Sequence, residues 1–131
     1  MTVVTTSRKA ADDLRALARH LAFATGARYL ARGKTGFAAL SDEAVILFTR
    51  EHGTIRFVVV DEGGEVALDR PVRLVQIAVR EGPIDRTLRI ADQSVYEVLK
   101  RYCDAEPAEA GAPSIVFDGQ QKKQIVLELA Q

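Results

Sequence analysis

The sequence predicts an α/β fold with a mixed parallel and antiparallel sheet. Two amphipathic segments, 7–25 and 94–102, each lie between short apolar or β-branched runs, and this strand–helix–strand order is typical of parallel pairing. Residues 44–79 instead contain apolar runs separated by short turns, which is the pattern of an antiparallel meander. Because one chain carries both patterns, we expect a single sheet that contains both kinds of pairing.

The N-terminal segment has the pattern of a strand followed by a long helix. Residues 2–5 are mostly β-branched and predict a short strand. Ser7 is expected to cap a helix that runs to about Thr25 and stops at Gly26. The apolar residues of this helix recur at helical spacing, which predicts one stripe facing a core: Leu14, Leu17, Ala18 and Leu21.

The next segment repeats the strand-to-helix order. Residues 27–31 predict a second strand, 32–36 a loop, and 37–41 a short helix. Residues 44–49 are almost all apolar, so they predict a strand buried on both faces. The turn at 51–54 then starts the meander.

Residues 55–61 predict the next strand, and the turn at 62–65 carries Gly63-Gly64, a hairpin signal. Further strands are expected at 66–68 and 72–79, on either side of Pro71. After residue 80 we expect a strand at 86–90, a helix from Ser94 to about Tyr102 with a Ser94/Glu97 capping box, a loop at 104–113, and closing strands at 114–117 and 124–129.

Length and composition indicate one globular domain over residues 1–131, with a first half of about 1–80 and a second half of about 81–131. Hydrophobic residues make up 47% and charged residues 27%, which is typical of soluble proteins and argues against disorder. No apolar run approaches a membrane span, no signal peptide is apparent, and Cys103 is the only cysteine. We therefore expect a cytoplasmic protein without membrane contact.

The charges are distributed unevenly although their total is zero. Residues 1–35 hold seven cations and two anions, a net charge of +5, whereas residues 36–113 hold nine cations and fourteen anions, a net charge of −5. Such asymmetry indicates an anionic partner, although a neutral total is unusual for a nucleic-acid binder.

Catalytic patterns are weak throughout the chain. Gly33-Lys34-Thr35 suggests a P-loop, but Arg28 stands where that motif needs its first glycine. His20 and His52 are expected to be solvated, and Cys103 has no obvious base. We therefore predict no enzyme, no catalytic residue, no cofactor, no metal and no small-molecule substrate.

The two strand-to-helix junctions hold the best candidates for binding. A helix N-terminus with hydroxyls and cations attracts phosphate, and both junctions should lie at one sheet edge if their strands are parallel neighbours. The same residues also suit plain caps with solvated cations, so only the pairing of the two junctions favours binding. The predicted contacts are Thr5, Thr6, Ser7, Arg8 and Lys9 at the first junction and Arg32, Gly33 and Lys34 at the second.

These motifs resemble the Brix domain family, in its short single-domain archaeal type. The resemblance rests on Thr5-Thr6-Ser7-Arg8, on Arg32-Gly33-Lys34 and on the closing strands 115–119 and 125–129, in the family's order along nearly the whole chain. It implies a ribosome biogenesis factor that binds ribosomal RNA or its precursor and acts as a non-enzymatic RNA chaperone in rRNA processing. It also implies two similar halves like the anticodon-binding domain of class II tRNA synthetases, and it adds Lys122 and Lys123 as candidate RNA contacts.

Two other functions remain open at this point. The acidic middle of the chain could serve a protein–protein interaction module within a larger ribonucleoprotein assembly, with ribosomal or other RNP proteins as partners. An enzyme acting on a phosphorylated small molecule is the third alternative. Aromatic residues are few and mostly lie in apolar stripes, so an exposed stacking platform for bases is not predicted.

Overall fold

The computed structural model describes residues 2–7, 10–30 and 43–130, and these form nine strands and two helices. In chain order the elements are β1 (Thr2–Thr6), α1 (Asp12–Thr25), β2 (Arg28–Leu30), β3 (Ala44–Glu51), β4 (Thr54–Val60), β5 (Val66–Val79), β6 (Leu88–Ile90), α2 (Gln93–Leu99), β7 (Ala105–Pro107), β8 (Ile115–Asp118) and β9 (Lys123–Leu129). The predicted helix at 37–41 lies outside the described residues. Neither described helix is long and apolar enough to cross a membrane.

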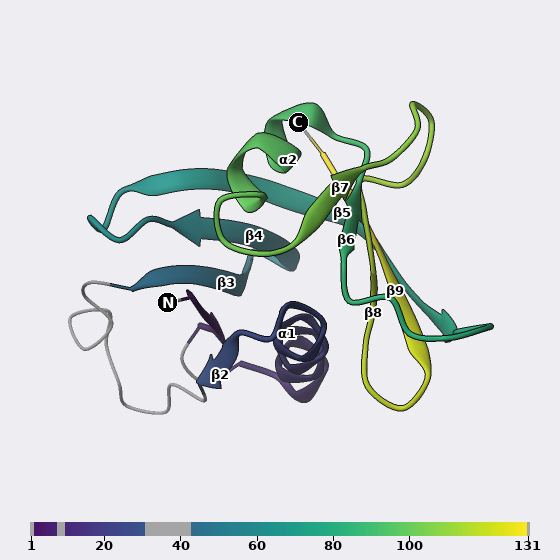
Figure 1. Ribbon diagram of the computed structural model, residues 1–131. Helices are drawn as coiled ribbons and strands as arrows, with labels where there is room; N and C mark the ends of the chain where they lie inside the picture. The colour runs from purple at the N-terminus through teal and green to yellow at the C-terminus, as the bar shows by residue number, and fades with distance from the viewer. Residues whose placement is uncertain (1, 8–9, 31–42, 131) are drawn as a thin grey trace.

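The strands form one curled sheet in the order β2-β1-β3-β4-β5-β9-β8-β6-β7 (Figure 1). β1 pairs in parallel with both β2 and β3, and β6 pairs in parallel with β7. All other neighbours are antiparallel. The predicted α/β fold with a mixed sheet is therefore confirmed.

Each edge of the sheet carries a strand–helix–strand unit. From one edge inward the order is β2-β1-β3-β4, from the other it is β7-β6-β8-β9, and both series meet at β5. They differ in one pairing, since β1 and β3 are parallel whereas β6 and β8 are antiparallel. The division of a single domain at about residue 80, just after β5, stays a prediction.

β5 is one long strand where two were predicted. Its first part pairs with β4 up to Pro71, and from Val72 onward it pairs with β9 on its other side. Proline cannot donate to a ladder, which suggested a break between two strands. The chain instead changes partners at this residue, and the Pro71 carbonyl accepts a hydrogen bond from Ala130 N at 2.9 Å.

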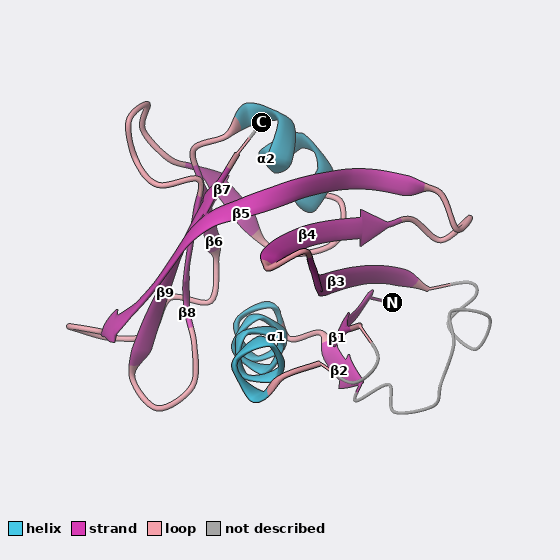
Figure 2. Ribbon diagram, turned by 180° about the vertical axis from the view of Figure 1, so that it is seen from behind, coloured by secondary structure: helices cyan, strands magenta, loops and turns pink. Residues whose placement is uncertain are grey.

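The main core lies between α1 and the concave face of the curled sheet (Figure 2). The predicted stripe of α1 is confirmed, because all four of its residues are at most 3% exposed. Phe48 and Phe57 stack across β3 and β4 with ring centroids 5.3 Å apart. The first five residues of β3 are buried, as expected for a strand covered on both faces.

The predicted N-cap at Ser7 is wrong. α1 begins five residues later, at Asp12, and its N-cap residue Ala11 offers no side-chain cap. The reason is that Ser7 stays with the sheet: its N–H donates to the carbonyl of Phe48 at 3.0 Å, next to the β1–β3 ladder. The C-terminal prediction is confirmed, since Gly26 follows the helix with a φ of 73°.

The predicted capping box of the second helix is also wrong. Asp92 caps α2, and its Oδ1 accepts hydrogen bonds from the N–H groups of Ser94 at 3.1 Å and Val95 at 3.3 Å. Glu97 instead pairs with Lys100 at 2.7 Å, one turn further along. The expected loop at 104–113 contains the short strand β7, which the parallel pairing with β6 holds in place.

Candidate nucleic-acid interface

The C-terminal ends of β1 and β2 lie side by side. The two strands are parallel neighbours with Thr5 opposite Leu30, as the argument from the two junctions required. The residues that follow these strand ends in the sequence carry most of the predicted cations. Arg8, Lys9, Arg32, Gly33 and Lys34 all lie outside the described residues.

The hydroxyls of the first junction are used within the fold. Thr5 is fully buried and its Oγ1 donates to the carbonyl of Leu30 at 2.6 Å, which ties β1 to the end of β2. Thr6 is 3% exposed and its Oγ1 donates to the carbonyl of Ser7 at 3.1 Å. Ser7 is half-buried and precedes the helix by five residues. Thr5 and Thr6 are therefore structural here and do not present free donors to a phosphate.

The β8–β9 turn presents the two predicted lysines. Gln121 and Lys122 have φ values of 57° and 58°, and the N–H of Lys123 donates to the carbonyl of Gln120 at 3.1 Å. These values define a tight type I′ hairpin turn, which usually contains glycine or asparagine. Lys122 is exposed and Lys123 half-buried, and no acidic side chain of the described residues pairs with either.

His20 holds this turn against α1, so the expectation of a solvated histidine is wrong. Its side chain is 8% exposed, and its Nδ1 accepts a hydrogen bond from the N–H of Gln120 at 3.0 Å. Burial, with help from the charges of Lys123 and Arg19, lowers the pKa of His20. The imidazole is therefore neutral at physiological pH.

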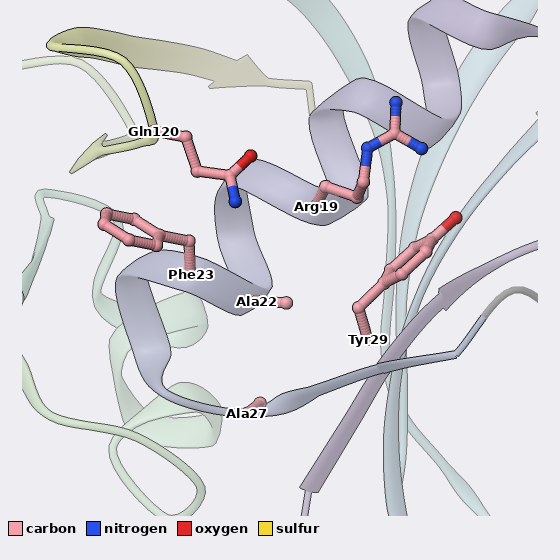
Figure 3. A pocket seen from close by; sticks show the side chains of 6 residues that line it. All are labelled: Arg19, Ala22, Phe23, Ala27, Tyr29 and Gln120. Carbon is pink, nitrogen blue, oxygen red and sulfur yellow. The ribbon is translucent and has the colours of Figure 1, made fainter.

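A hollow of about 340 Å³ lies between α1, the start of β2 and the β8–β9 turn (Figure 3). Tyr29 and Phe23 are half-buried at its sides, and Gln120 reaches toward it from the turn. The Arg19 guanidinium lies 5.9 Å from the centre of the Tyr29 ring, and the Arg86 guanidinium lies 4.3 Å from that of Phe23. The described residues that line the hollow are Arg19, Ala22, Phe23, Ala27, Tyr29 and Gln120.

The hollow can accept a flat, electron-rich group. Aromatic faces and guanidinium planes stack on nucleobases, and a carboxamide can both donate and accept hydrogen bonds at a base edge. Arg19 is the one charged residue among the described residues of its lining, and it is a cation. The sequence did not predict this stacking arrangement because its residues come from α1, β2 and a turn some 100 residues away.

The hollow also relates the two sets of predicted contacts. On one side Tyr29 directly precedes Leu30, the last residue of β2, whose carbonyl Thr5 binds. On the other side Gln120 begins the turn that contains Lys122. These three features, the hairpin lysines, the hollow and the end of β2, form one edge of the molecule. A strand of nucleic acid that ran along this edge would meet them in that order.

Cys103 lacks the properties of a nucleophile. Its thiol is half-buried and donates to the carbonyl of Leu99 at 3.3 Å. Burial, together with the nearby charge of Asp104, raises the pKa of Cys103 to about 12. Within the described ranges, no three His, Cys, Asp or Glu side chains gather where they could hold a metal ion.

The fold is similar to that of a known archaeal protein. The crystal structure of Mil, an archaeal Imp4-like protein, matches with a TM-score of 0.64 over 98% of this chain and 97% of that one, at 17% sequence identity. No protein-family model and no curated protein sequence matches the chain. The comparison therefore shows that the chain has the fold of this Imp4-like protein, nearly from end to end.

Proposed function

We propose that this protein is a non-enzymatic ribosome biogenesis factor that binds precursor ribosomal RNA. The observation that carries the proposal is the fold similarity to an Imp4-like protein over almost the entire chain. It agrees with the Brix resemblance of the Thr5-Thr6-Ser7-Arg8 and Arg32-Gly33-Lys34 motifs, which is independent of the fold comparison. In this role the protein acts in the cytoplasm as an RNA chaperone or assembly factor, alongside ribosomal or other RNP proteins.

The proposed RNA contact runs along the edge that holds the hollow. Lys122 and Lys123 bind backbone phosphates, and one unpaired base stacks beside Tyr29 or Phe23. Arg8, Arg32 and Lys34 follow β1 and β2 in the sequence, and we propose them as further phosphate contacts because the ends of these two strands are adjacent. Since phosphate neutralisation dominates RNA affinity, a neutral protein needs its cations gathered on one edge.

Filter binding of precursor ribosomal RNA at several salt concentrations tests the proposal. We expect Lys122→Ala, Arg8→Ala and Arg32→Ala each to weaken binding and to reduce the salt slope by about 1. Lys100→Ala is the matched control, because Lys100 directly follows α2, is 45% exposed and pairs with Glu97. α2 and the β8–β9 turn lie at opposite ends of the molecule (Figure 1).

Equal binding by these variants and the Lys100→Ala control would contradict the proposed edge. No binding of any ribosomal RNA by the folded wild-type protein would contradict the RNA role itself. In that case a protein–protein module is the second candidate, and the exposed apolar residues at the end of β5 favour it. That alternative predicts co-purification with a protein partner after nuclease treatment.

A further inference from the structure

The second part of β5 has an unpaired edge. From Val72 to Val79 the strand pairs with β9 on one side, while β4 accompanies β5 only as far as Pro71. No other described strand pairs along this edge. Unpaired strand edges are templates for pairing with another chain.

The backbone groups that face this edge follow from the hydrogen-bond pattern. The N–H of Arg80 donates to the carbonyl of Lys122 on the β9 side. Because antiparallel residues alternate in direction, the N–H and C=O groups of Val75, Ile77 and Val79 point away from β9. The open edge therefore presents three residues whose donors and acceptors have no ladder partner among the described strands.

Apolar side chains accompany this edge without being covered. Leu74 is 46%, Ile77 52% and Val79 78% exposed. A groove of about 410 Å³ continues from the edge toward the start of β4, and Arg50 and Arg73 are its charged lining residues. The surface beside the edge is thus apolar at the end of β5 and cationic near its middle.

We propose that two copies of this chain pair through this edge, in antiparallel orientation with Ile77 opposite Ile77. In this register, residues whose backbone N–H and C=O groups point away from β9 lie opposite each other in the two copies. Val75 of one copy is therefore opposite Val79 of the other. The register also brings Glu81 of one copy, two residues past the end of β5, near Arg73 of the other, which stands at the bulge in the β5–β9 pairing beside the cationic groove. Neither Arg73 nor Glu81 has an ion-pair partner among the described residues. The pairing lies on β5 and is independent of the RNA role.

Sedimentation velocity over a range of concentrations tests this pairing on the full chain. The wild type is expected to form a dimer, and Ile77→Lys to be monomeric because two like charges would meet at the centre. Val66→Lys is the matched control, since Val66 is 61% exposed at the other end of β5, outside the pairing segment. Circular dichroism confirms that each variant is folded.

Charge exchange and cross-linking test the register. Arg73→Glu and Glu81→Arg are each expected to weaken the dimer, and the double variant to restore it.

In this register Gln76 of one copy faces Ala78 of the other as a non-hydrogen-bonded pair, whose close Cα atoms suit a disulfide. On a Cys103→Ser background, a mixture of Gln76→Cys and Ala78→Cys chains should form a heterodimeric disulfide under oxidation, and either chain alone should not. A wild type that stays monomeric at all concentrations, or a dimer that survives Ile77→Lys, overturns the proposal.

Discussion

The backbone N–H of Gln120 donates a hydrogen bond to Nδ1 of His20 at 3.0 Å, across 100 residues of chain. This contact joins the β8–β9 turn to α1. The helix α1 lies between β1 and β2, at the far end of the sheet order from β8 and β9. The contact also positions Gln120 beside the hollow and determines where Lys122 and Lys123 lie relative to Tyr29.

Stability is expected to fall below neutral pH because of His20. Burial, Lys123 and Arg19 lower the pKa of His20 in the folded protein, so only the unfolded chain binds this proton near its ordinary pKa of 6.5. The contribution of neutral His20 to the free energy of unfolding is present above pH 6.5 and is lost as the pH falls through the pKa of His20 in the folded protein. Chemical denaturation at several pH values should show this loss, and His20→Gln, which keeps an acceptor but does not titrate, should show a flatter profile. An unchanged profile would exclude His20 as the titrating group.

Gly119→Ala is expected to destabilise the protein by about 1–3 kcal/mol, the usual cost of overpacking. A Cβ at this position would overlap the imidazole of His20 and lie 2.7 Å from Cδ1 of Ile125, a fully buried side chain. Gly63→Ala is the matched control, because the atom that its added Cβ would meet, Oδ1 of Asp61, lies 3.4 Å away, at ordinary contact distance. Equal midpoints for the two variants in urea unfolding would contradict the close packing at Gly119.

Asp92 is expected to make the free energy of unfolding fall at acidic pH. Its burial raises its pKa, but hydrogen bonds from Arg70, Ser94 and the Val95 N–H outweigh this and hold the pKa of Asp92 at about 2. A carboxylate with a depressed pKa stabilises the fold above its unfolded pKa, near 4, and this stabilisation is lost as pH falls toward 2.

Asp92→Asn should therefore cost about 1–3 kcal/mol at neutral pH, because it removes the charge that pairs with Arg70 at 2.7 Å. It should also reduce the acid dependence of unfolding. Asp69→Asn removes a more exposed ion pair, with Arg56, and is expected to cost under 1 kcal/mol. If the two variants unfold alike at pH 7 and at pH 3, Asp92 does not have the role inferred here.

Tyr29→Leu is expected to weaken binding of single-stranded ribosomal RNA by about 1–3 kcal/mol, the usual contribution of one stacked base. Leucine keeps an apolar contact with the core but removes the aromatic face beside Arg19. Tyr96→Leu is the matched control, since Tyr96 lies on α2, is also half-buried and has a cation, Lys100, beside its ring. Fluorescence anisotropy with labelled RNA measures both variants, and the same affinity for both would exclude the hollow as a base site.

The mixed sheet, most strand positions and the buried stripe of α1 could all be predicted because they depend on local periodicity and turn chemistry. The two helix starts could not, because hydroxyl and carboxyl side chains suit several neighbouring cap positions. α1 starts late because the backbone of Ser7 continues the pairing of β1 with β3. At the start of α2, the ion pair between Arg70 and Asp92 favours Asp92 as the cap. Pro71 marked a real discontinuity, but only the sheet reveals that the strand changes partners there.

By itself, the sequence determined the fold class, the single cationic end and the family resemblance, since each follows from residue types and their order. The tertiary structure alone decided what these residues face. It buried Thr5, Thr6 and His20, placed Tyr29 and Gln120 around one hollow, and left one edge of β5, from Val72 onward, without a pairing strand among the described residues. These outcomes depend on contacts between segments far apart in the chain, and pairing across such distances is set by the packing of the whole sheet around α1.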